Sequence, residues 1–199
     1  MGAAGAGQVG RQVHQPDQPP AARTRSPHRA ATLTEQDYRD LSAACTSPMH
    51  DLVLALAGVH AASPHQIRHL LLEDIDVGNR RLLIGTVERH LDGYTMRALD
   101  AWLRHRRERW PYAMNRHLLI SNYTARTSGP ISSYTLTHLF GPPLPAVDRV
   151  RRDRQLEEAL SHGPDPLHLA IMFGISGTTA AFYADSARQL LEQATTPPS

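Results

Sequence analysis

The chain has 199 residues, of which 41% are hydrophobic, and this suits one folded domain with a sizeable core. It contains no long apolar run and no apolar signal core near its start, so we expect neither a membrane span nor export. The single cysteine, Cys45, excludes an internal disulfide framework and suits a reducing cytoplasm, where we expect the protein to reside. The formal net charge of +2, with 21 arginines and no lysine, is weak evidence for nucleic acid.

The first half of the chain contains a low-complexity stretch followed by helical signals. Residues 1–31 are rich in Gly, Ala, Gln, Pro and Arg without apolar periodicity, which predicts a disordered arm. A Thr-Glu-Gln-Asp capping box opens residues 34–46, which we expect to be helical. Ser-Pro pairs predict the starts of two further helices, one over 49–60 after Ser47-Pro48, with Val59 among its core positions, and a short one from Ser63-Pro64 through residue 70.

A small sheet is expected next. The phrase LLEDID at 71–76 is followed by a turn signal, a strand-like segment at 80–85 and a returning segment at 86–91. The pair Asp92-Gly93 indicates another turn. Residues 94–110 then show the spacing of an amphipathic helix.

Residues 149–191 contain three helical patterns with almost no spare loop. The first has a basic start and stops at His162, Asp165 is a suitable N-cap for the second, and Gly174 is the glycine expected after a helix end. Two kinds of DNA-handling unit fit this segment. One is a helix-turn-helix, and the other is the closing segment of a tyrosine recombinase, in which Tyr183 would be the nucleophile.

Four short motifs resemble those of the tyrosine recombinase, or phage integrase, family, and in particular an actinobacterial integrase-like subset. The family's His-x-x-Arg, Gly-x-Asp, Leu-Gly-His and Thr-Thr-x-x-Tyr boxes correspond here to Arg149–Arg152, Gly163–Asp165, Phe173–Ile175 and Thr178–Tyr183. The spacing matches the family's, except that the last step is one residue short. LLEDID and the later phrase HLLIS occur in the family's order, and the resemblance spans roughly residues 34–192.

The resemblance implies a mostly α-helical α+β fold, an integrase catalytic-domain-like helical bundle with a small three-stranded antiparallel sheet. It implies that Tyr183 and Arg152 take the catalytic positions of nucleophile and second arginine. The neighbouring Arg149, Arg151 and Arg154 are expected to bind DNA phosphates.

Several residues that the family's chemistry needs are absent. Ser63 falls where the first family arginine is expected, Arg149 and Ile175 fall on two histidine positions, and only Arg89 or His90 lies near the lysine position. A phenol of ordinary pKa near ~10 is a poor nucleophile, and the charge that gathers on the phosphate in the transition state needs preorganised donors. We therefore expect a degenerate, DNA-binding relative with impaired strand transfer.

The expected organisation is a disordered arm at 1–31, a recombinase-like domain at 32–192 and a disordered tail at 193–199. Duplex DNA is the expected partner, with a homo-oligomer on DNA as a further expectation and no membrane contact. No cofactor is expected, and His65 with His69 has metal-compatible spacing but no obvious third ligand.

Three other interpretations stay open. The first is a non-catalytic helix-turn-helix regulator, and the second is a decayed gene product without a selected function. In the third, Tyr183 is a core residue whose hydroxyl binds a backbone carbonyl.

Overall fold

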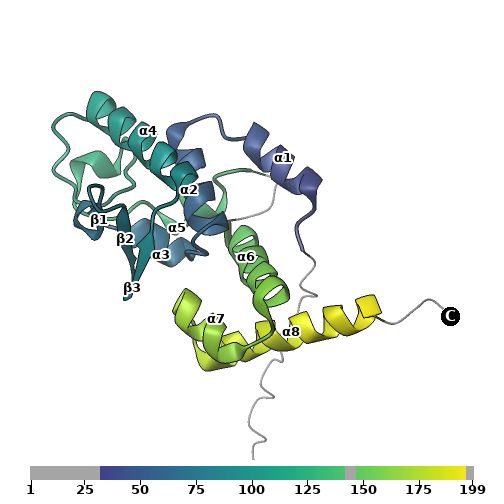
Figure 1. Cartoon of the computed structure of the whole chain (residues 1–199). Helices are drawn as coiled ribbons and strands as arrows, with labels where there is room; N and C mark the ends of the chain where they lie inside the picture. The colour runs from purple at the N-terminus through teal and green to yellow at the C-terminus, as the bar shows by residue number, and fades with distance from the viewer. Residues whose placement is uncertain (1–31, 142–146, 196–199) are drawn as a thin grey trace, which may run out of the picture.

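The computed structural model describes residues 32–141 and 147–195, where the chain is mostly helical with one small sheet (Figure 1). The expected arm at 1–31 lies outside the described residues. Within the described ranges, no helix is both long and apolar enough to cross a bilayer. In chain order the elements are α1 (Glu35–Ala43), α2 (Pro48–Gly58), α3 (Pro64–His69), η1 (Leu72–Asp74), β1 (Ile75–Asp76), β2 (Arg81–Ile84), β3 (Val87–His90), α4 (Gly93–Arg109), η2 (Thr124–Arg126), α5 (Ser133–Thr137), α6 (Val147–His162), α7 (Pro166–Phe173) and α8 (Gly177–Thr195). The predicted fold class is confirmed.

Local hydrogen bonds fix the starts of the helices where the sequence predicted them. At α1, the backbone N–H of Asp37 donates to Thr34 Oγ1 at 3.1 Å, and that of Thr34 donates to the Asp37 carboxylate at 2.8 Å. Ser63 and Gln66 form the same capping box at α3. Proline holds the first position where its missing N–H costs no helical hydrogen bond, in α2, α3 and α7.

The helix ends differ from the predicted ones. α1 ends at Ala43 rather than near residue 46, and α2 ends at Gly58 rather than at residue 60. Two residues beyond Val59, Ala61 has a φ of 52°, so the chain has already left the helix. Val59 is 38% exposed, and its prediction as a core residue is wrong because it lies past the turn that faces the core.

α8 extends into the segment expected to be a tail. Its bounds reach Thr195, whose Oγ1 donates to the carbonyl of Leu191 at 2.8 Å and satisfies one of the last carbonyls of the helix. The segment between these two residues, Glu-Gln-Ala, consists of good helix formers. Residues 196–199 lie outside the described residues.

The sheet has the order β1-β2-β3, with both pairs antiparallel. Ile84 pairs with Val87, so residues 85 and 86 form a two-residue turn in which Gly85 takes a φ of +64°. Leu82 and Ile84 are buried on one face of the sheet. Asp92 does not form the expected turn. Its carboxylate accepts hydrogen bonds from the first N–H groups of α4 and serves as that helix's N-cap.

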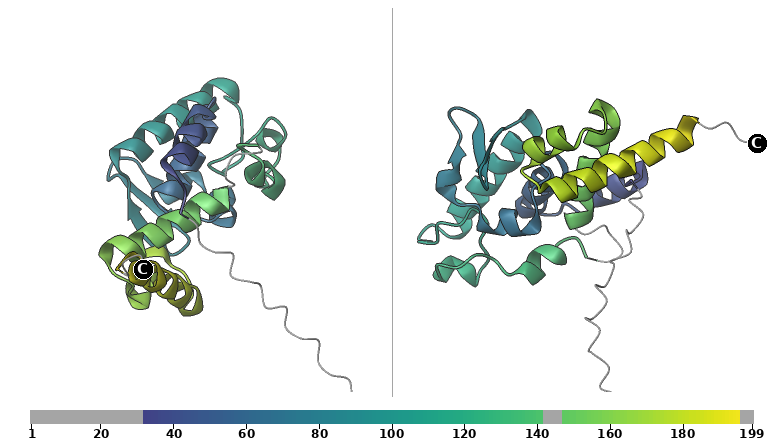
Figure 2. Two further views of the ribbon diagram at one scale, coloured as in Figure 1. Left: turned by 90° about the vertical axis from the view of Figure 1, so that its right-hand side faces the viewer. Right: turned by 90° about the horizontal axis from the view of Figure 1, so that it is seen from below.

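Two hydrophobic clusters pack against the two halves of α6. The larger joins α2, α3, β2, α4 and the run 118–120, and it includes Val147 and Val150 from the start of α6. The smaller includes Leu156 and Ala159 from the later turns of α6, with residues of α7 and α8. Figure 2 shows α8 lying against α7 and crossing α6. The N-terminal half of α6 therefore packs in the larger cluster, and its C-terminal half packs in the smaller one.

Candidate nucleic-acid interface around Tyr183

The β2–β3 turn lies between the start of α3 and the end of α7. A β-carbon added at Gly85 would lie 3.4 Å from Nε2 of Gln66, and one added at Gly174 would lie 3.0 Å from Cγ2 of Val87. Gly174 takes the left-handed conformation predicted for a helix end, with a φ of +61°. The start of α3, the β2–β3 turn and the end of α7 therefore lie side by side. These are the segments that carry three of the family's expected box positions.

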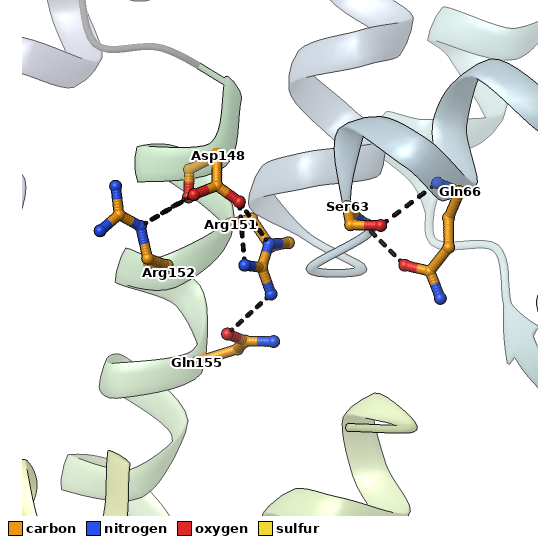
Figure 3. Close-up of polar contacts among 6 residues, drawn as sticks. All are labelled: Ser63, Gln66, Asp148, Arg151, Arg152 and Gln155. Atoms are coloured by element: carbon orange, nitrogen blue, oxygen red, sulfur yellow. Dashed lines mark hydrogen bonds and ion pairs between the residues drawn. The ribbon is translucent and has the colours of Figure 1, made fainter. Parts of the chain in front are cut away.

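The side chain and backbone of Ser63 form hydrogen bonds within its own helix, α3. Its Oγ accepts a hydrogen bond from the backbone N–H of Gln66 at 3.2 Å, and its backbone N–H donates to Gln66 Oε1 at 2.9 Å (Figure 3). The residue at the first family arginine position therefore caps α3. It supplies no cationic group to a phosphate.

Asp148 forms ion pairs with two arginines in the first turns of α6. Its Oδ1 accepts from Nε and Nη2 of Arg151 at 3.0 and 2.9 Å, and its Oδ2 lies 3.1 Å from Nε of Arg152. Nη1 of Arg151 also donates to Gln155 Oε1 at 3.2 Å. In Figure 3 the two arginine side chains point to opposite sides of α6, with Asp148 between them. Sequence reasoning missed Asp148 and Gln155, although their spacing of three and four residues from the arginines was a usable signal.

Tyr183 lies on α8 beside this arginine pair and is 3% exposed. Burial raises the pKa of its phenol, the charges of Arg151 and then Arg152 lower it, and the charge of Asp148 raises it again. Arg151 has the larger of the two arginine effects, so Arg152 is not the only arginine close to the tyrosine. No partner for the Tyr183 hydroxyl exists among residues 32–141 and 147–195, so the hydroxyl is not held by a backbone carbonyl.

Arg149 and Arg154 lie elsewhere. Arg149 is exposed and faces the start of α1, where Thr34 hydrogen bonds lower the pKa of Asp37 and the charge of Arg149 lowers it further. Arg154 donates to Glu158 at 2.7 Å and stacks on the Phe173 ring at 5.9 Å. The four arginines of α6 therefore do not converge on one point.

Arg154 belongs to an interior polar cluster on the smaller core. The carboxylate of Glu158 is 4% exposed, and its Oε1 lies 3.1 Å from ring nitrogens of both His162 and His168. Arg89, which lies near the family's lysine position, stacks on Phe173 at 5.9 Å. Its Nε is buried without a partner among the described residues. In this cluster Arg154 is neutralised by the buried Glu158, so its charge is used within the protein.

His60 lies between this cluster and the start of α4. Its Nε2 is 3.0 Å from Thr95 Oγ1 and 3.6 Å from Asp92 Oδ2. Burial lowers the pKa of His60 to about 4, and the charges of Arg89 and Arg154 act in the same direction. His60 is therefore neutral near neutral pH, so it does not replace the missing arginine as a charge.

Two other expectations concern histidine chemistry. Ile175, at a family histidine position, is half-buried and packs against the smaller core, so it adds no donor. The rings of His65 and His69 are 4.2 Å apart. In the part of the chain that the structure describes, no group of three or more His, Cys, Asp or Glu side chains is arranged to hold a metal ion.

Comparison with known proteins identifies the fold. No protein-family model and no curated protein matches the chain. Among solved structures, the chain is similar to XerA recombinase, with a TM-score of 0.65 and 16% identity over 91% of this chain and 67% of XerA. It is similar to the Tn1549 transposon integrase in complex with transposon right end DNA, with a TM-score of 0.61 and 16% identity over 83% of this chain and 66% of that one.

A third similar structure is XerH site-specific recombinase bound to a palindromic difH substrate. Its TM-score is 0.61 and its identity 15%, over 83% of this chain and 52% of XerH. The chain thus spans about two thirds of XerA and about half of XerH. At these identities the likeness defines architecture. The chain has a fold like that of the tyrosine recombinase catalytic domain.

Proposed function

We propose that this chain binds duplex DNA through its recombinase-like fold, and that strand transfer by Tyr183 is impaired. The observation that carries the proposal is the arginine pair, Arg151 and Arg152, lying beside a buried tyrosine on the adjacent helix. Guanidinium groups bind phosphate oxygens strongly because they are planar, permanently charged and able to donate two parallel hydrogen bonds. XerH and the Tn1549 integrase, which share the fold, have DNA in their solved complexes.

The residues take distinct roles in this proposal. Tyr183 holds the nucleophile position and Arg152 that of the second family arginine. Arg151 is the second phosphate ligand beside the tyrosine, and the exposed Arg149 reaches a neighbouring phosphate. Arg154, paired with a buried carboxylate, contributes mainly to the protein interior.

The impairment follows from missing donors and a raised phenol pKa. Ser63 caps a helix, Ile175 is apolar and the chain has no lysine, so three groups that would neutralise charge or transfer a proton are absent. Each missing donor to a developing oxyanion typically costs on the order of 10²–10³ in rate. Burial also raises the pKa of Tyr183, which disfavours the phenolate nucleophile.

The helix-turn-helix alternative finds less support. A recognition helix presents polar and basic side chains outward to base edges. α8 instead buries Tyr183 and three alanines, and its exposed face has one basic residue, Arg188, which is paired with Asp185. That face offers little for reading bases.

The test is the binding of a duplex of generic sequence, measured by fluorescence anisotropy at several salt concentrations. Replacing Arg151 and Arg152 with alanine should weaken binding and reduce the log–log salt slope by about 0.9 for each phosphate that the protein no longer neutralises. Arg104→Ala removes one surface charge on α4, from an arginine that pairs with Asp100, and is the control. Equal slopes for the double variant and the control would contradict the proposal.

A nicked duplex that traps phosphotyrosyl intermediates tests the catalytic part. We expect no adduct, or a trace that disappears in Tyr183→Phe. Restoring Ser63→Arg and Ile175→His together should increase that trace, because both changes return donors to the region of the tyrosine. Efficient trapping by the unmodified chain would show that other side chains supply the missing charge.

A further inference from the structure

The arginine pair of α6 already holds an anion that belongs to the protein itself. Asp148 Oδ1 accepts hydrogen bonds from both donors on one edge of the Arg151 guanidinium, Nε at 3.0 Å and Nη2 at 2.9 Å. Its Oδ2 lies 3.1 Å from Nε of Arg152. We propose, building on the proposed function, that Asp148 is an internal substitute for a DNA phosphate, whose carboxylate must leave the two arginines when DNA binds.

The chemistry of the two anions supports the substitution. A carboxylate and a phosphodiester each present two oxygens that share one negative charge, and a guanidinium binds both with the same two-pronged geometry. A phosphate that approaches Arg151 in the most favourable direction therefore meets donors that Asp148 already occupies. The two anions compete for one binding edge.

The surroundings allow the carboxylate to leave without unpacking the helix. The Asp148 side chain is 44% exposed and that of Arg152 is 46% exposed, so solvent reaches the pair. Asp148 is in the first turn of α6, whose neighbouring residues Val147 and Val150 are buried and fix the backbone. Arg151, only 17% exposed and bound to Gln155, keeps its place when Asp148 rotates away.

Release of Asp148 also changes the environment of Tyr183. In the described state the carboxylate opposes the effect of both arginines on the phenol, because its charge raises the tyrosine pKa where theirs lower it. A bound phosphate in the same place would keep a negative charge near Tyr183. The exchange therefore replaces one negative charge near Tyr183 by another.

The experiment compares Asp148→Asn with Asp100→Asn in duplex binding. Asp100 pairs with Arg104 on α4 in an exposed ion pair of the same spacing as that between Asp148 and Arg152, so both variants gain one unit of charge. Asp148→Asn should bind generic duplex roughly 3- to 10-fold more tightly than the unmodified chain, and Asp100→Asn by less than about two-fold. The gain should vanish when Arg151 and Arg152 are also replaced with glutamine. Asp148→Ala, checked for an intact thermal unfolding transition, is the second variant.

The outcomes separate the two claims. If the unmodified chain binds duplex and Asp148→Asn binds no better than Asp100→Asn, Asp148 is only a helix-start acid that favours the α6 dipole, and the inference is overturned. A gain that persists without the two arginines overturns it as well. If no variant binds duplex even at low salt, the proposed function itself fails, and the inference fails with it.

Discussion

Gly174 faces Val87 so closely that a β-carbon in place of its hydrogen would crowd the valine side chain. The glycine ends α7 with a φ of +61°, and a β-carbon there would lie 3.0 Å from Val87 Cγ2. The contact holds the end of α7, and the start of α8 behind it, against β3 of the sheet. The position of Tyr183 relative to the rest of the fold therefore depends on a residue without a side chain.

Gly174→Ala should lower the free energy of unfolding by about 1–3 kcal/mol, because alanine disfavours the left-handed conformation and its methyl group would press on Val87. Urea unfolding measures the change. Gly177→Ala is the control, since Gly177 starts α8 with no atom near its would-be β-carbon and an ordinary φ. A loss of the same size in both variants would contradict the prediction.

Buried His60 should make stability depend on acidity. Its pKa is about 4 in the folded chain against an ordinary value of 6.5, so the unfolded chain binds the proton more readily. The contribution of His60 is fully present above pH ~6.5 and is lost as the pH falls toward ~4, to a total of roughly 3 kcal/mol. Unfolding free energies across this window should be less pH-dependent in His60→Gln. His138→Gln, at an exposed position, should keep the full slope.

Glu158→Gln should be strongly destabilising. Its side chain is 4% exposed and binds Arg154, His162 and His168, so the amide would remove the nearer and more buried of the two carboxylates that pair with Arg154. Breaking a buried ion pair from one side costs about 3 kcal/mol or more, measurable by urea unfolding. Glu157→Gln is the matched control. Glu157 is next in sequence, 63% exposed and 3.7 Å from Arg154, so its loss should be within about 0.5 kcal/mol.

Tyr183→Phe should leave the folded chain as stable as before, or slightly more stable. The hydroxyl has no hydrogen-bond partner within the described ranges, and the ring packs in the smaller core. Only Arg89 Nε and Gln155 Nε2 are buried side-chain polar atoms without a partner among the described residues, so the Tyr183 hydroxyl still reaches solvent, and its removal takes away no protein hydrogen bond. Thermal unfolding measures the change. A loss above about 1 kcal/mol would mean that the hydroxyl is bound after all.

The local structural features that depend on residues close together in the chain could be predicted from the sequence. The capping box at Thr34, the helix start at Ser63-Pro64, the end of α7 at Gly174 and the short hairpin all depend on residues within a few positions of each other. The order of the family-like motifs predicted the fold, because a chain with those helices and strands in that order has few ways to bury them. Asp92 was mistaken for a turn because Asp-Gly opens turns and also caps helices.

The site could be predicted only in part. Of the four arginines of α6, Arg151 and Arg152 are the two whose charges act on Tyr183, and their roles toward DNA stay a prediction. Which arginine faces the tyrosine depends on side-chain rotations that follow from packing. Asp148 was missed because an acid in the first turn of a helix is ordinary, and only the fold places it beside α8. Arg106 is a similar case. It is buried, donating to the carbonyls of Asn115, His117 and Leu118, which helix periodicity could not indicate.

The division of α6 between two cores has a consequence for motion. Five of the nine buried members of the smaller cluster are alanines, whereas the larger is rich in leucine, so far less apolar area holds α7 and α8 in place. Local opening is cheapest where buried apolar area is least. We expect the C-terminal helices to form the cooperative unit that opens first, while the first turns of α6 stay anchored through Val147 and Val150. Backbone amide hydrogens should therefore exchange fast around Tyr183 in α8 and slowly around Arg151 and Arg152 in α6.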